Sequence, residues 1–86
     1  MNTYLLTISS PDGNLLKEEV TGLFLRGAEG DLAILAGHIP FVTTVKAGEC
    51  KVEFPDASEK KGYTEGGLLV VSNEGTSLLS GTFRWE

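Results

Sequence analysis

The spacing of glycine and proline limits most strongly what this chain can fold into. Eleven glycines and three prolines divide the 86 residues so finely that residues 1–10 form the longest uninterrupted stretch. Helices shorter than about 12–15 residues are marginal on their own, so helices are disfavoured almost everywhere. Turn residues recur about every 8–12 positions, which is typical of short antiparallel strands. The chain is therefore predicted to be all-β.

The segments between the turns carry the polarity patterns of strands. In residues 4–9 the even positions are predicted to face a core, and in residues 50–54 charged residues alternate with apolar ones. Residues 14–21 fit either a helical turn or a strand. Residues 55–61 are expected to form the polar tip of a hairpin whose return strand starts at Tyr63.

About nine or ten short strands in one small chain predict a β-sandwich or flattened barrel, formed by a single domain over residues 1–86. The last strand expected with any clarity is residues 76–80. Trp85 follows that strand, and it is expected to pack over the edge of the sandwich or to belong to a continuation of the chain.

The composition excludes several classes of partner. The formal net charge is −5 and the sequence pI is about 4.7, which is the wrong sign for nucleic acid or an anionic membrane surface. Apolar runs reach four residues, as in Leu68–Val71, against the roughly 20 that span a bilayer. Cys50 is alone, so no internal disulfide forms. We expect a soluble, cytoplasm-facing domain that reaches a membrane only through a partner.

The residue patterns of an enzyme are nearly absent. His38 is the single histidine, and no Gly-x-Ser-x-Gly motif presents a nucleophilic serine. One histidine and one cysteine do not make a zinc site, and the acidic residues do not follow the calcium-loop pattern. Gly27 and Gly30 lack the Lys-Ser/Thr that completes a phosphate-binding loop. No catalytic residue, metal or cofactor is expected.

The most structured part of the sequence is the segment from Gly27 to Pro40. It predicts a tight acidic turn around Glu29, a short strand over residues 31–35, a second corner at residues 37–40 and a strand over residues 41–45. A strand flanked by two corners presents polar groups at the ends of a rigid sheet, where a partner can reach them.

The polar residues of this segment have two interpretations each. His38 either hydrogen-bonds the loop backbone at its corner or contacts a partner through its ring nitrogens. Glu29 and Asp31 are either solvated or paired with a basic residue of a partner, where they steer approach more than they add affinity. Gly30 and Gly37 are interpreted as residues that permit unusual backbone angles.

Two predicted strands are apolar on both faces. They are Leu23-Phe24-Leu25 and Leu68–Val71, and an outer strand of a free-standing sandwich normally has a polar solvent face. Phe24, and Leu68 or Val70 according to register, therefore suggest a second apolar face that something else covers. The alternative is that these side chains are exposed singly, as happens in many small proteins.

The central segment resembles the signature of a known family. The pattern Gly-x-x-Gly-Asp-Leu-x-Ile-Leu-x-Gly-His-x-Pro, followed by Phe-Val-Thr, is similar to that of the epsilon subunit of bacterial F-type ATP synthases, called delta in mitochondria. The match extends to Ser10-Pro11-Asp12-Gly13, to Val45-Lys46-Ala47-Gly48 and to Gly66-Gly67, and so covers essentially the whole chain.

The resemblance implies a fold, a function and partners. In this family a ten-stranded β-sandwich stands at the foot of the central stalk, against the gamma subunit and the membrane c-ring, and couples ion flow to ATP synthesis without catalysis of its own. Such a subunit lies on the cytoplasmic face of the cell membrane as part of the complex. By position, Glu29, Gly30 and Asp31 correspond to the c-ring contact. The gamma-facing residues implied are Ser10, His38 and Thr43, together with the apolar Phe24.

The chain departs from the family pattern in two places. Relatives continue beyond the position of Glu86 into a C-terminal helical hairpin that inhibits ATP hydrolysis and in some members senses ATP; neither property is assigned to residues 1–86. We expect a domain taken from a longer chain in preference to a naturally short epsilon subunit. Ala36 stands where a proline is common, which predicts a looser corner. The alternative function is a free-standing β-sandwich module that binds another protein or a small ligand.

Overall fold

The computed structural model describes residues 2–86, and every regular element in this part is a β-strand. The strands are β1 (Tyr4–Ser10), β2 (Gly13–Val20), β3 (Gly22–Gly27), β4 (Gly30–Leu35), β5 (Phe41–Val45), β6 (Gly48–Glu53), β7 (Glu59–Thr64), β8 (Gly67–Ser72), β9 (Gly75–Ser80) and β10 (Phe83–Trp85). The prediction of an all-β sandwich or flattened barrel is confirmed. Within residues 2–86 no helix is long and apolar enough to cross a bilayer.

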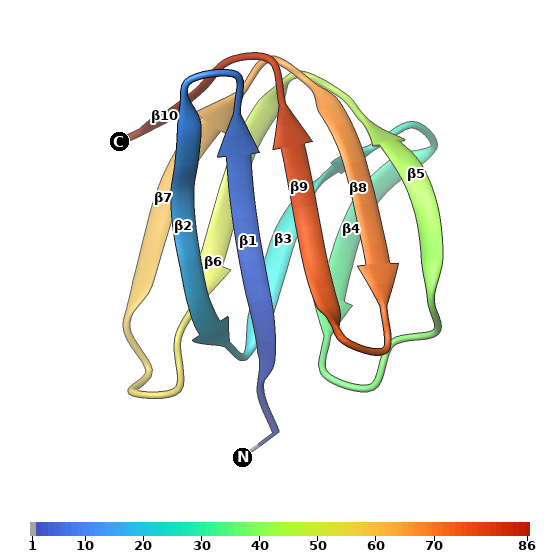
Figure 1. The fold of residues 1–86 in the computed structure, drawn as a ribbon, viewed down its shortest axis with the longest axis vertical. Coiled ribbons are helices and arrows are strands. Elements are labelled where there is room, and N and C mark those ends of the chain that lie inside the picture. Colours follow the sequence, from blue (N-terminus) through green and yellow to red (C-terminus); the bar gives the residue numbers. More distant parts are fainter. Residues whose placement is uncertain (1) are drawn as a thin grey trace.

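The strands form two layers that face each other (Figure 1). The front layer has the order β2-β1-β9-β8-β5, and the back layer has the order β10-β7-β6-β3 with β4 on the other side of β3. A single pair, Gly27 with Val45, joins β3 to β5 and makes the two layers one curled sheet. Most neighbours are antiparallel, whereas β1 and β9 are parallel.

The core lies between the layers and is built from the inward positions of nearly every strand. Leu6 and Ile8 of β1 are fully buried, as the alternation predicted, and so are Cys50 and Val52 of β6. The remaining buried apolar residues are Leu16, Val20, Leu23, Leu25, Ile34, Val45, Leu69, Val71, Leu78 and Phe83. Fully burying one such side chain stabilises the fold by about 1.5–3 kcal/mol.

Three local expectations are settled by the structure. Residues 14–20 lie in strand β2, because Leu16 and Val20 are buried beneath the front layer and the backbone pairs with β1. The hairpin tip is shorter than expected and the return strand starts at Glu59, because residues 59–63 pair with β6. Trp85 belongs to β10 and packs against the core. Its ring meets that of Phe83 edge-on, with 4.9 Å between the ring centroids.

Candidate docking surfaces

The acidic turn joins β3 to β4 at one end of the sandwich. Gly27 pairs with Gly30, and the φ angle of +134° at Gly30 closes this two-residue hairpin. Glu29, Gly30 and Asp31 are all exposed. The three residues expected to contact the c-ring therefore project together into solvent, at the end of the molecule drawn at the top of Figure 1.

A cavity of about 300 Å³ separates the acidic turn from β5. One wall consists of the turn from Gly27 to Leu32, and the other consists of Phe41, Val42 and Thr43. Thr43 is half-buried in this cleft. Thr43 is expected on the gamma-facing surface, and the structure thus brings it close to the acidic turn that is expected to contact the c-ring.

The outer side of β5, β8, β9 and β1 is an uncharged surface, which we call the front face. The positions that alternate with the buried residues of these strands are Leu5, Thr7, Ser9, Val42, Thr44, Leu68, Val70, Ser72, Ser77 and Leu79. The four strands themselves carry no charged residue, and the charges stand at the border of this face, on Lys17 and Glu19 of the neighbouring β2 and in the turns at the strand ends, such as Glu74.

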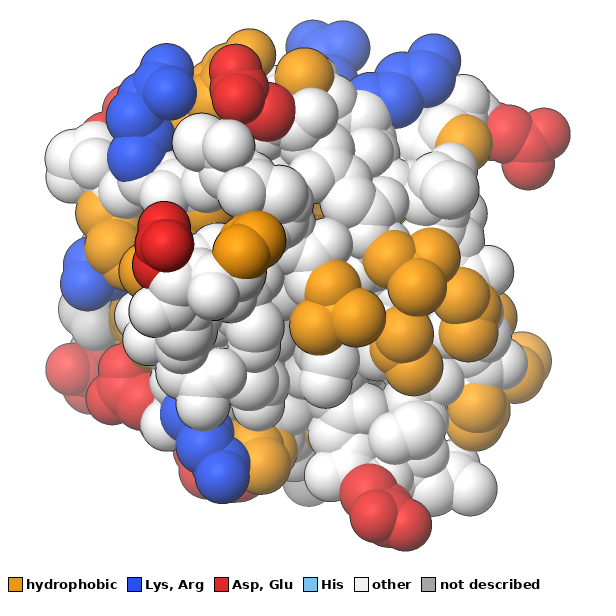
Figure 2. Space-filling view, turned by 45° about the horizontal axis from the view of Figure 1, so that its top comes forward, with side chains coloured by type: hydrophobic (Ala, Val, Ile, Leu, Met, Phe, Trp, Pro, Cys, Tyr) orange, Lys and Arg blue, Asp and Glu red, His pale blue; other side chains and the backbone are white. Residues whose placement is uncertain are grey.

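The apolar members of the front face lie next to one another. Val70 pairs with Val42 on one side, and Leu68 pairs with Leu79 on the other. Val42 is 61% exposed and Leu79 is 46% exposed. Figure 2 shows hydrophobic side chains gathered into a patch on this side of the molecule, surrounded by uncharged surface.

Both Leu68 and Val70 face outward, so the second apolar face inferred from the sequence is present on this strand. The sequence reasoning missed Val42 and Leu79. Leu79 had the same signal as Leu68, because Leu78-Leu79 are adjacent apolar residues that must point to opposite sides of β9.

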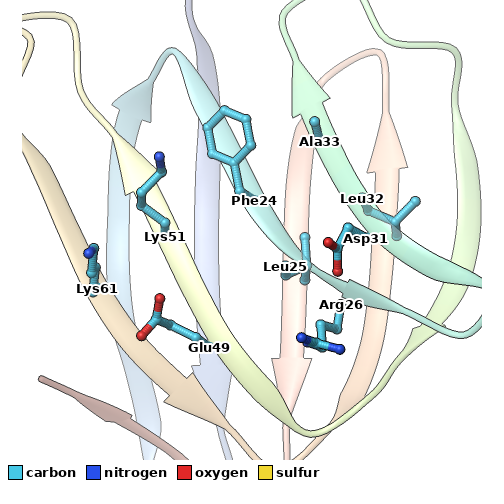
Figure 3. A pocket seen from close by; sticks show the side chains of 9 residues that line it. All are labelled: Phe24, Leu25, Arg26, Asp31, Leu32, Ala33, Glu49, Lys51 and Lys61. Atoms are coloured by element: carbon cyan, nitrogen blue, oxygen red, sulfur yellow. The ribbon is translucent and has the colours of Figure 1, made fainter.

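Phe24 lies on the opposite outer surface of the molecule, over the back layer. The Nζ of Lys51 stands 4.8 Å from the centroid of the half-buried Phe24 ring, and the same Nζ lies 3.5 Å from a carboxylate oxygen of Glu53. An open hollow of about 490 Å³ adjoins the ring, with Arg26, Asp31, Glu49 and Lys61 in its lining (Figure 3). This surface is apolar only at its centre and charged around it, unlike the front face.

Ser10 and His38 lie at opposite ends of the sandwich. The hydroxyl of Ser10 accepts a hydrogen bond from the amide of Asp12 at 3.2 Å in the turn after β1. His38 is exposed on the loop between β4 and β5, with its Nδ1 2.9 Å from the carbonyl oxygen of Ile39 and its ring 5.0 Å from that of Phe41. Ser10, Phe24, His38 and Thr43 are therefore not gathered on one patch.

Two observations on residues 2–86 concern metal binding and thiol reactivity. Between residues 2 and 86, no group of three or more His, Cys, Asp or Glu side chains is placed to hold a metal ion. Burial raises the pKa of the Cys50 thiol from 9.0 to about 12, which keeps it protonated and unreactive at neutral pH.

Sequence comparison identifies the family. The model of the beta-sandwich domain of the ATP synthase delta/epsilon chain matches residues 3–86. The chain belongs to this family. The resemblance found in the central segment is thereby confirmed.

Curated relatives carry the same family name. The chain is 34% identical over 83 residues to the sodium ion specific ATP synthase epsilon chain of Acetobacterium woodii, covering 96% of this chain and 62% of that one. It is 31% identical over 80 residues to the epsilon chain of Clostridium kluyveri, covering 93% and 61%. The chain thus spans about three-fifths of the length of these relatives.

Solved structures share the fold. A chain in the Euglena gracilis mitochondrial ATP synthase superposes with a TM-score of 0.91 at 24% identity, over 96% of this chain and 53% of that one. A chain in the central stalk and c-ring structure of the Tetrahymena thermophila enzyme superposes with a TM-score of 0.82 at 14% identity, over 96% and 66%. At these sequence identities, the two comparisons show a shared fold.

Proposed function

We propose that residues 1–86 are the β-sandwich domain of a non-catalytic ATP synthase epsilon subunit, which docks on the gamma subunit and the c-ring and turns with them. In this role the domain couples ion flow to ATP synthesis mechanically, with no cofactor of its own. It sits on the cytoplasmic face of the cell membrane as a peripheral part of the complex. Membership of the epsilon family supports the proposal.

The uncharged front face is the observation that carries the docking part of this proposal. The chain has 19 charged side chains, yet none lies on the outer side of β5, β8, β9 or β1 among the described residues. The solvent side of an antiparallel sheet is normally polar. A permanent interface buries about 2,000 Å² or more and is depleted in charge, which matches this face. We assign the front face to the gamma subunit.

The acidic turn suits a different contact. Glu29 and Asp31 project from the end of the sandwich, where they can meet basic side chains on the polar loops of the c-ring. Charges at the rim of an interface mainly raise the association rate and select the partner. The turn is a short hairpin closed by Gly27 and Gly30, so it holds these carboxylates without a long flexible loop. We assign Glu29, Gly30 and Asp31 to the c-ring.

The four residues proposed for the gamma subunit differ in how well they fit one interface. His38, on the loop that leads into β5, and Thr43 within that strand lie beside the front face. Ser10 ends β1, which belongs to the front layer. Phe24 lies over the back layer, so it joins the contact only where the partner extends around the β4 edge.

Co-expression with the gamma subunit of the same enzyme tests the proposal. We expect a stable complex that survives gel filtration at moderate salt and recruits the c-ring. A chain that stays monomeric in the presence of gamma and c-ring would instead support the alternative, a free-standing β-sandwich module that binds another protein or a small ligand.

A further inference from the structure

The hydroxyl of Tyr4 connects the two layers of the sandwich. Tyr4 begins β1 in the front layer, and its Oη donates a 2.6 Å hydrogen bond to the carbonyl oxygen of Ile34 in β4. These strands share no ladder, because within residues 2–86 β4 pairs with β3 alone. The bond therefore ties β4 directly to a strand with which it shares no backbone pairing.

The surroundings of this bond hold it in place. The Tyr4 ring packs against the core, and Ile34 is almost fully buried. Burial raises the pKa of the Tyr4 hydroxyl far above its ordinary value, and Cys50 adds to the effect, so the group stays a donor throughout the physiological range. A buried donor or acceptor that loses its partner costs more than the bond itself contributes.

Ile34 stands at the base of the loop between β4 and β5. Beyond Leu35 the chain turns at Gly37, where φ is +86°, and the amide of His38 donates to the carbonyl of Leu35 at 3.2 Å. Ile39, which follows, is 78% exposed. A cavity of about 220 Å³ lies between this loop and the start of β1, with Tyr4 and His38 in its walls. The loop thus projects from the point that Tyr4 fixes.

We propose that Tyr4 is a positioning residue for docking, whose hydroxyl fixes the base of the β4–β5 loop and thereby the placement of His38 and Ile39 against the partner. The inference rests on the proposed function, because this loop leads directly into the front face assigned to the gamma subunit. It adds a residue whose proposed effect on docking acts through the backbone of β4.

Tyr4→Phe tests this role, because it removes the hydroxyl and leaves the ring. The matched control is Tyr63→Phe, since Tyr63 is the other tyrosine of the chain and its hydroxyl makes no hydrogen bond within residues 2–86. Hydrogen exchange of the His38 amide, which donates to the carbonyl of Leu35 within the loop, should become about three- to tenfold faster in Tyr4→Phe, the effect of losing one hydrogen bond. Exchange in the β6–β7 ladder should stay unchanged.

The affinity of each variant for the gamma subunit is measured in parallel. We expect Tyr4→Phe to bind about three- to tenfold more weakly and Tyr63→Phe to bind as the parent chain does. Unchanged exchange in the loop overturns the positioning role. Faster exchange throughout the molecule overturns it too, because that is a loss of global stability. Faster loop exchange with full affinity contradicts a role in docking. Failure of the parent chain itself to bind gamma contradicts the proposed function, while the exchange result still decides whether Tyr4 holds the loop.

Discussion

The hydroxyl oxygens of Thr64 and Ser80 lie 2.7 Å apart in the interior, where β7 of the back layer and β9 of the front layer end together. The Ser80 hydroxyl donates to the carbonyl of Thr82, so the Thr64 hydroxyl donates to Ser80. The Thr64 oxygen also accepts from the amide of Gly66. The hydroxyls of these two buried side chains thus provide hydrogen-bond partners for backbone groups in the turns that follow β7 and β9.

Replacing Thr64 with Val should destabilise the fold by about 1–3 kcal/mol, because the partly buried amide of Gly66 loses its acceptor and the buried Ser80 hydroxyl loses a partner. Urea unfolding measures the change. Thr82→Val is the control, since Thr82 is exposed and the variant should shift the free energy of unfolding by less than about 0.5 kcal/mol. Equal shifts in the two variants would mean that the hydroxyl pair has no structural role.

Gly67→Ala should be among the most damaging alanine substitutions in the chain. A Cβ at Gly67 would collide with the backbone of Leu79 on the neighbouring strand β9. Backbone atoms in a sheet cannot move aside as the end of a flexible side chain can. Forcing an extra carbon into a packed site costs about 1–3 kcal/mol. At Gly81 a Cβ meets nothing, so Gly81→Ala should leave the unfolding midpoint nearly unchanged. A Gly67→Ala protein as stable as the parent would show that β8 and β9 are not packed as described.

Stability should decline in alkaline solution, partly through Cys50. Its thiol has a pKa of 9.0 in the unfolded chain and about 12 in the folded one. Between these values the unfolded state is deprotonated and the folded state keeps its proton, so folding stability falls as pH rises, by up to about 1.4 kcal/mol per unit. Below pH 9 this contribution is constant.

Chemical unfolding of the parent and of Cys50→Ala at several pH values checks the sign of this pH dependence. The parent should lose stability more steeply than the variant between pH 9 and 10. Parallel slopes would show that the thiol ionises freely in the folded state, and rapid alkylation of the native protein at pH 8 would show the same.

Much of the fold follows from local sequence, whereas the docking surfaces do not. Glycine and proline mark the turns because they alone supply the required backbone angles, and alternation at residues 4–9 correctly places Leu6 and Ile8 inside. Phe24 and Leu68 looked equivalent in the sequence, since each is a surplus apolar residue in a two-faced strand. They lie on opposite outer surfaces because β3 and β8 belong to different layers, which only long-range pairing decides.

The candidate docking surfaces also include features that the local sequence predicts and features that depend on contacts between distant residues. The acidic turn was predictable, because Gly27 and Gly30 bracket two residues and close a hairpin. The hydrogen bond from Tyr4 to Ile34 spans 30 residues and has no sequence signal. The uncharged front face becomes visible only when β5, β8, β9 and β1 are placed side by side.

Charge reversal in the acidic turn should weaken association with the c-ring while the fold survives. Asp31→Lys places a cation where the proposed partner is basic, and Asp31 is exposed, so unfolding should be almost unaffected. The loss should appear mainly in the association rate and should shrink at high salt. Glu74→Lys, an exposed charge at the other end of the sandwich, is the control. Equal effects of the two variants would show that only the net charge of the protein matters and that the acidic turn makes no specific contact.

The measurement that tests the account most directly is the affinity of the gamma subunit for Leu79→Asp and Ala57→Asp. Leu79 is 46% exposed on the front face, so Leu79→Asp should fold. Ala57 is exposed at the tip of the β6–β7 hairpin, away from the proposed docking surfaces, and aspartate tolerates its φ of +72°, so Ala57→Asp should fold too. A buried charge at the centre of an interface costs at least about 2 kcal/mol, so Leu79→Asp should bind gamma at least about 30-fold more weakly. Ala57→Asp should bind within about threefold of the parent, because its site lies outside the assigned interface. Full binding by Leu79→Asp, or an equal loss in both variants, would contradict docking through the front face.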